Sequence, residues 1–75
     1  MEDQIENISV FATNIKTETD KQEISNLLDQ HSEIQQWNID QEDVDCVLRI
    51  VSQTLSEKQI IKLVDQHHFE CIALE

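Results

Sequence analysis

The chain has 75 residues, the length of one small domain, and the core that such a length can bury is small. Its 16 acidic and 5 basic residues give a formal net charge of −11, which repels nucleic-acid phosphates and anionic lipid surfaces. The absence of glycine and proline excludes glycine-rich phosphate loops and EF-hand loops. We therefore expect one domain over residues 1–75 that binds neither nucleic acid nor a membrane.

The first residues argue against a targeting segment. Residues 1–5 are acidic where a signal peptide would be basic, and no run approaches the roughly 18 apolar residues of a membrane-spanning helix. The two cysteines, Cys46 and Cys71, are too few for a secreted disulfide scaffold. We therefore expect a cytoplasmic protein in which residues 1–7 form a loose extension ahead of the domain.

The first half of the chain predicts a strand, a helix and a second strand. Residues 8–15 are short and rich in strand-forming side chains. Thr19 and Gln22 have the spacing of a capping box, which starts a helix. Apolar residues then repeat with helical spacing, and residues 34–39 alternate as a strand does. The positions that share the helix face are Ile24, Leu27, Leu28 and His31.

The second half repeats this order after a turn in the acidic run at residues 40–43. Alternating side chains at Cys46, Leu48 and Ile50 predict a third strand. A second capping box, formed by Ser56 and Gln59, starts a helix, and residues 69–74 form a final strand. The apolar face of this helix contains Ile60, Leu63, Val64 and His67.

The predicted order β-α-β-β-α-β defines an α+β, ferredoxin-like fold. Two right-handed crossovers joined by a hairpin produce a four-stranded antiparallel sheet, of strand order 4-1-3-2, with both helices on one face. In this order Cys46 and Cys71 lie about two strand spacings apart, about 9–10 Å. A disulfide requires Cα atoms within about 7 Å, so we expect both cysteines to fill space in strands.

Three segments resemble a known family. They are residues 11–15 (Phe-Ala-Thr-Asn-Ile), 34–40 (Ile-Gln-Gln-Trp-Asn-Ile-Asp) and 55–61 (Leu-Ser-Glu-Lys-Gln-Ile-Ile), followed by Val64 and Phe69. Over about residues 8–74 the chain resembles the heavy-metal-associated domain of copper chaperones and metal-transport ATPases, in its bacterial single-domain members. The resemblance implies the same ferredoxin-like fold.

The metal-binding motif of that family is not present here. In the family, a CxxC loop between the first strand and first helix binds Cu(I) or Zn(II) through thiolates, and its two cysteine positions fall on Thr17 and Asp20. Glu18 and Thr19 stand between them, and His68 stands where the family commonly has glycine. The resemblance therefore implies the fold but assigns no metal ligand to this chain.

Residues 17–20 allow several interpretations. They fit the capped start of a helix, because hydroxyl groups cap the first turn and carboxylates favour the positive end of the helix dipole. They also fit a partner-docking loop or a metal site with oxygen ligands. In the last case Glu18, Asp20 and His68 are the candidate ligands for Zn(II) or another divalent metal. His67 continues an apolar helix face, so we expect it to be partly packed.

Other chemistry-bearing residues favour structural roles. The acidic residues 40–45 lack the glycine of a calcium loop, so we expect a hydrated hairpin turn. Trp37 has strand spacing with Ile39 and indicates packing. Arg49 lies in a strand, away from the loop in which acylphosphatase-like enzymes of this fold place an arginine. No catalytic arrangement is evident, and we expect a protein that is not an enzyme.

Three functions remain compatible with the sequence. The first is a non-enzymatic interaction domain, resembling a metallochaperone whose thiol site is lost, with an acidic surface suited to a basic protein partner. The second is a metal-ion-binding protein that uses His, Asp and Glu ligands at the same loop. The third is a small-molecule sensor similar to amino-acid-binding regulatory domains of this topology, although those usually need a glycine in the first loop. The sequence leaves the oligomeric state open.

Overall fold

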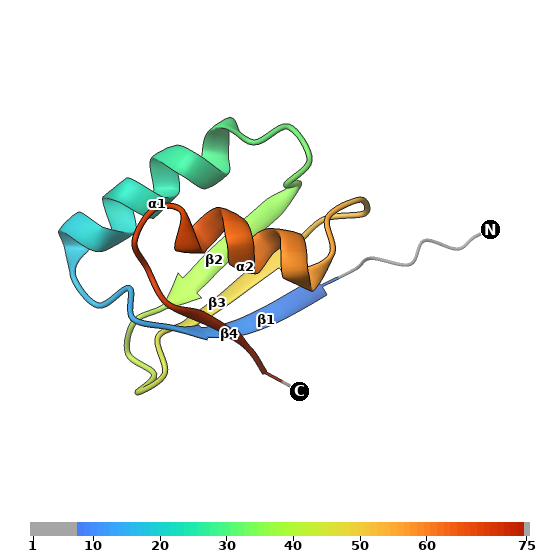
Figure 1. Cartoon of the computed structure of the whole chain (residues 1–75). Helices are drawn as coiled ribbons and strands as arrows, with labels where there is room; N and C mark the ends of the chain where they lie inside the picture. The colour runs from blue at the N-terminus through green and yellow to red at the C-terminus, as the bar shows by residue number, and fades with distance from the viewer. Residues whose placement is uncertain (1–7, 75) are drawn as a thin grey trace.

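The computed structural model describes residues 8–74, so the extension expected at residues 1–7 lies outside the described residues. The elements appear in the predicted order β-α-β-β-α-β (Figure 1). They are β1 (Ile8–Thr13), α1 (Glu18–Gln30), β2 (Gln36–Asp40), β3 (Val47–Val51), α2 (Glu57–Asp65) and β4 (Cys71–Ala73). Neither helix in this part of the chain is long and apolar enough to cross a membrane.

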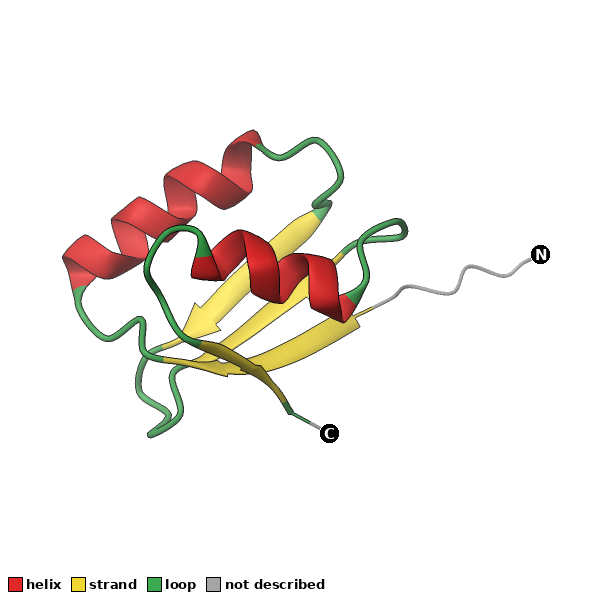
Figure 2. Cartoon of the chain, in the orientation of Figure 1, coloured by secondary structure: helices red, strands yellow, loops and turns green. Residues whose placement is uncertain are grey.

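The strands form one antiparallel sheet of order β2-β3-β1-β4, which is the predicted order read from the other edge. Both helices cover the same face of this sheet (Figure 2). The ferredoxin-like layout is therefore confirmed. Within residues 8–74 the opposite face of the sheet carries no helix, so the sheet has two chemically different surfaces.

The core lies between the sheet and the helices. Phe11 on β1 pairs with Leu48 on β3, and both side chains are fully buried. The helices contribute buried residues at the expected spacing, namely Ile24, Leu28, Ile60 and Val64. Leu27 and Leu63 were also expected in the core but are only half-buried. Leu27 packs against the core from the margin of the apolar helix stripe, and Leu63 lines an open groove beside α2.

The two helix starts differ in how well the sequence predicted them. The predicted capping box of Ser56 and Gln59 is confirmed, with Gln59 N donating to Ser56 Oγ at 3.2 Å and Ser56 N donating to Gln59 Oε1 at 2.8 Å. The box predicted for Thr19 and Gln22 is wrong, because α1 starts two residues earlier. Its N-cap is Thr17, and Asp20 completes the box. An Asp at the third helical position fills the role we assigned to a later Gln, and its charge also favours the helix N-terminus.

The way in which α2 ends explains the backbone conformation of His68 and the exposure of His67. His68 has a left-handed backbone with φ of 69°, and Phe69 N donates to Val64 O at 3.5 Å while His68 N donates to Asp65 O at 2.9 Å. These are the paired hydrogen bonds of a Schellman motif, whose left-handed position favours glycine. His67 is exposed rather than partly packed. That expectation was wrong because the helix ends at Asp65, so helical spacing no longer places His67 on the apolar face.

The two cysteines are free and buried, as expected. Thr13 separates them, since it pairs with Cys71 on β4 while its Oγ1 donates to Cys46 O at 2.6 Å on the other side. Cys46 itself precedes β3 and has a φ of 45°, so it belongs to the hairpin loop and not to the strand in which we placed it.

Candidate functional site

Two loops that are distant in sequence meet where β1 ends. The amide Nε2 of Gln41, in the β2–β3 loop, donates to Ile15 O at 3.2 Å and to Thr17 O at 2.9 Å in the β1–α1 loop. Thr13 N also donates to Asp45 O at 2.9 Å. These bonds fix the hairpin loop against the start of α1.

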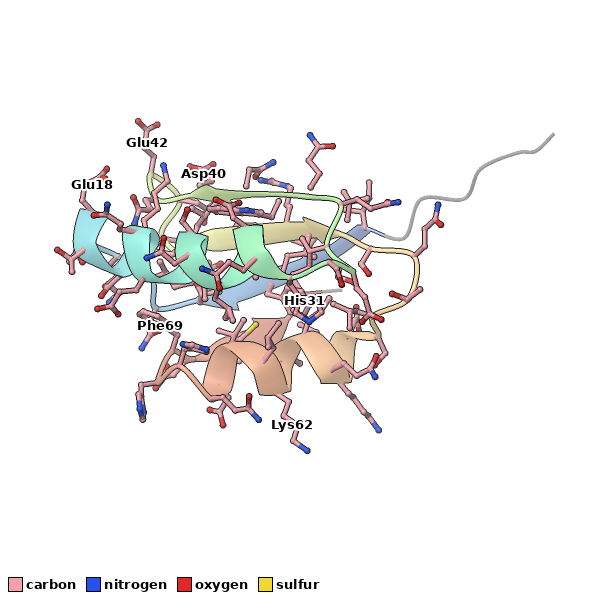
Figure 3. The ribbon with its side chains drawn as sticks, turned by 90° about the horizontal axis from the view of Figure 1, so that it is seen from above. Glu18, His31, Asp40, Glu42, Lys62 and Phe69 are labelled. Atoms are coloured by element: carbon pink, nitrogen blue, oxygen red, sulfur yellow. The ribbon has the colours of Figure 1, made fainter. Side chains whose placement is uncertain are left out.

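A third loop joins the same end of the molecule. Asn14 Oδ1 accepts a hydrogen bond from Glu70 N at 2.8 Å, which ties the α2–β4 loop to the end of β1. The three loops and the first turn of α1 gather six carboxylates here, and we call this surface the acidic end: Glu18, Asp20, Glu42, Asp43, Asp45 and Glu70. Figure 3 shows Glu18 and Glu42 at one end of the molecule, away from His31. The sequence placed these residues in separate segments, and only the antiparallel topology brings them together.

The carboxylates of the acidic end fall into two groups. Asp20 Oδ2 accepts from Lys16 N and Thr17 N, both at 3.3 Å, and Asp43 Oδ1 accepts from Asp45 N at 2.9 Å. These two carboxylates stabilise the backbone of their own loops. Glu18, Glu42, Asp45 and Glu70 are exposed, and within residues 8–74 their side chains accept no hydrogen bond. The second group is therefore free to meet a partner.

The candidate metal ligands lie at this same end, Glu18 and Asp20 in the first turn of α1 and His68 in the α2–β4 loop. However, within residues 8–74 no group of three or more His, Cys, Asp or Glu side chains is placed to hold a metal ion. The Asp20 carboxylate is held by the first turn of α1, and His68 is held in its left-handed turn. The arrangement at this end does not favour the metal-binding interpretation.

The positions aligned with the family's cysteines face each other across the start of α1. Thr17 Oγ1 accepts from Asp20 N at 3.0 Å, and Asp20 Oδ2 accepts from Thr17 N at 3.3 Å. Their side chains therefore converge on the helix N-terminus. This geometry agrees with the interpretation of residues 17–20 as a capped helix start. The same geometry would place two thiols near the positive end of a helix dipole, which favours thiolate.

The remaining residues singled out from the sequence have structural positions. The acidic residues 40–45 form a hairpin turn in which Asp40 Oδ1 accepts from Glu42 N at 3.1 Å. Trp37 packs against the core, and its Nε1 donates to Asp29 Oδ1 at 2.8 Å, a link between β2 and α1 that the sequence did not predict. Arg49 lies on β3 and is exposed.

Burial decides the chemistry of Cys71. Desolvation in the core raises the pKa of the Cys71 thiol to about 12 from 9.0, so this group stays protonated near neutral pH. A protonated, buried thiol is a poor nucleophile and a poor metal ligand.

An open groove of about 340 Å³ runs along α2 beside the C-terminal end of α1. It is lined by His31, Leu55, Gln59, Lys62, Leu63 and Gln66. The groove does not involve the β1–α1 loop, which is where the sensor hypothesis requires its ligand. It therefore gives that hypothesis no support.

The fold and the acidic end together define a small ferredoxin-like α+β domain with a carboxylate-rich loop surface. Comparison with family models, with curated proteins and with solved structures finds no match to this chain. The resemblance to the heavy-metal-associated domain therefore stays a prediction.

Proposed function

We propose that this chain is a non-enzymatic protein-interaction domain that docks a basic partner through its acidic end. The observation that supports this proposal is the meeting of three loops, fixed by hydrogen bonds from Gln41, Thr13 and Glu70, which gathers carboxylates at one end of the sheet. The proposal explains why the free carboxylates are held on ordered loops. A surface that is only solubilising does not need this ordering.

Electrostatic attraction should set the rate and the salt dependence of this docking. A chain with a net charge of −11 attracts a basic partner over distances near the Debye length, and a patch of fixed carboxylates then orients it. Lys16 and Lys21, near the start of α1, offset part of this charge. The association should be fast and strongly weakened by salt.

We further propose that the domain derives from a metallochaperone-like scaffold whose thiol site is lost. Two details support this. The Thr17 and Asp20 side chains converge where the family places its two cysteines. His68 adopts the left-handed conformation that suits the glycine common at that position of the family. Chaperones of this family transfer metal through complementary charged faces, so docking would be the part of the function that remains.

The experiment uses an octalysine peptide as the probe and follows backbone amide signals by NMR. We expect shifts to concentrate in residues 14–20 and 41–46, and we expect the affinity to fall with added salt. The double variant Glu18→Gln with Glu42→Gln should weaken octalysine binding by about three- to fivefold, the loss expected for two exposed charges.

A control variant with the same change in net charge separates the patch from the total charge. Glu33 lies between α1 and β2, and Glu57 opens α2, so both are exposed at the other end of the molecule. Glu33→Gln with Glu57→Gln should leave the affinity within about twofold. Equal losses in both variants would show that octalysine responds to net charge alone and would contradict a defined docking site.

A further inference from the structure

The face of the sheet opposite the helices carries a second surface. Since alternate strand residues point to opposite faces, the neighbours of the buried Phe11, Leu48 and Cys71 point away from the core. Many of these neighbours are apolar. Ile8 on β1 is 55% exposed and Ile72 on β4 is 65% exposed.

These side chains form one continuous patch. Ile8 pairs with Val51 across β1 and β3, and Ala12 pairs with Ile72 across β1 and β4. Leu74 N donates to Val10 O at 2.9 Å, which extends the patch along β4. We call this surface the open face; its residues are Ile8, Val10, Ala12, Gln36, Asn38, Asp40, Val47, Arg49, Val51, Ile72 and Leu74, apolar on β1 and β4 and polar on β2. The largest apolar patch on a typical monomeric protein covers about 300–600 Å² and often has a function.

The open face differs in charge from the rest of the chain. Arg49 lies within it, beside Val10 on the neighbouring strand. Asp40 lies on the same side of the sheet at the end of β2, because Ile39 before it points to the core. Arg49 is exposed on β3. Among residues 8–74 this face carries one cation and one anion, so that part of it is close to neutral on a chain of net charge −11.

We propose that the open face packs against the open face of a second copy of this chain in a two-fold symmetric dimer. A two-fold interface uses the same patch twice, so a face that carries both Arg49 and Asp40 is complementary to itself: the arginine of one copy meets the aspartate of the other. Charge also selects this face. Two copies that each carry −11 repel through their acidic surfaces and approach with least repulsion through the near-neutral one.

The size of the face sets the strength of this dimer. Four strands spaced by about 4.8 Å and five residues at about 3.3 Å each cover roughly 300 Å² in projection. A stable dimer buries about 800 Å² on each partner. The pairing is therefore weak and reversible, with a dissociation constant in the micromolar range or above.

The test is sedimentation velocity of the full chain from about 10 µM to about 1 mM, at low and at high salt. We expect the average mass to rise from 8.8 kDa toward twice that value with concentration. Salt should strengthen the dimer, because it screens the repulsion between the copies. Octalysine binding at the acidic end responds to salt in the opposite direction, so failure of one proposal is distinguishable from failure of the other.

Substitutions on and off the open face test whether it forms the dimer interface. Ile72→Asp should weaken the dimer at least tenfold, because it puts a carboxylate into the apolar patch. The matched control is Val44→Asp, which makes the same change in charge at a side chain that is 91% exposed in the β2–β3 loop. It should change the dissociation constant by less than threefold. Ile72→Thr, which keeps a β-branched side chain, serves as the second variant and should also weaken the dimer.

Three results would overturn the proposal. One is a chain that stays monomeric up to about 1 mM at both salt concentrations. Another is an equal effect of Ile72→Asp and Val44→Asp. The third is a dimer that Ile72→Thr does not weaken. In each case the open face is not the contact between two copies.

Discussion

The acidic end and the open face differ in almost every physical respect. The first is built from loops, is held by side-chain hydrogen bonds such as those of Gln41, and collects negative charge. The second is built from strands, is held by the backbone ladder, and is apolar on β1 and β4 and close to neutral. The comparison shows that the −11 charge of this chain is not spread evenly. Each surface suits a different kind of partner, and salt should act on them in opposite directions.

The largest expected effect tests whether the open face is truly outside the core. Leu28 is 1% exposed, so Leu28→Ala should lower the free energy of unfolding by about 2–4 kcal/mol through lost burial and a cavity. Ile72→Ala, at an apolar side chain that is 65% exposed, should cost less than about 1 kcal/mol. Urea denaturation of dilute protein measures both. Similar losses for the two variants would mean that Ile72 is covered within the monomer.

The next effect tests the lost thiol site at the acidic end. Thr17→Cys with Asp20→Cys should create a CxxC that binds Cu(I) or Zn(II) at one ion per chain, because the two side chains converge. The change removes the observed capping box, so it should cost about 1–2 kcal/mol of stability. The carboxylate of Glu18 will raise the thiol pKa values and limit the affinity.

Metal stoichiometry by native mass spectrometry, and competition with a Cu(I) chelator, compare this double variant with each single variant. The unmodified chain should hold no Cu(I) as firmly as a dithiolate does, since Cys46 and Cys71 are separated by β1. A double variant that binds no better than either single variant would show that this loop is not a vacated metal site.

A smaller effect is the pH dependence of stability that Cys71 should cause. Cys71 lies on the inward side of β4, whereas Ile72 lies on its outward side. Burial raises the pKa of Cys71 to about 12 in the folded chain, above its ordinary value of 9.0. A raised pKa means that the folded state holds the proton more tightly. This contribution to stability is complete below pH 9 and is lost as the pH rises from about 9 toward 12.

We expect Cys71 to account for a loss of about 1 kcal/mol between about pH 9 and pH 10. The measurement is urea denaturation at each pH, with Cys71→Ala as the reference. Other groups titrate in both proteins, so the difference between their pH profiles isolates the thiol. Parallel profiles would mean that Cys71 is not desolvated and that the inward face of β4 is wrongly assigned.

The smallest expected effect tests the left-handed backbone of His68 at the end of α2. His68→Gly should stabilise the chain by about 0.5–1 kcal/mol, because glycine adopts a positive φ without the steric cost that His68 bears. His68→Val should destabilise it by about 1 kcal/mol or more. His67→Gly is the matched control and should be neutral or destabilising, since His67 lacks the positive φ. Thermal unfolding ranks the three, and a stabilising His67→Gly with a neutral His68→Gly would contradict the Schellman turn.

Much of the fold could be predicted from local patterns. The element order and the strand order follow from apolar periodicity and from the rules of chain connection, and the capping box at Ser56 follows from its spacing. The start of α1 could not be placed as well, because Thr17, Thr19, Asp20 and Gln22 offer competing caps within six residues. Which of these residues caps α1 depends on the path of the chain between β1 and α1. The hydrogen bond from Gln41 to Thr17 O is one of the contacts that fix this path.

The candidate site was less predictable. The sequence singled out Glu18, Asp20 and His68, but the bonds of Asp20 to Lys16 and Thr17 are visible only in three dimensions. Gln41 gave no signal, although its side chain joins two loops. A long polar residue beside a turn is common, and its partners lie more than twenty positions away, so local spacing contains no information about them.

By itself, the sequence of this protein determined the periodicity of each element, the net charge and the absence of a CxxC motif. These are local or additive properties, and each can be read from neighbouring residues or from a sum. The tertiary structure decided which carboxylates share one end, which apolar residues lack a cover, and why His68 occupies a position suited to glycine. These depend on contacts between segments far apart in the chain, because antiparallel pairing and helix packing set them, and no local pattern specifies which distant residues will meet.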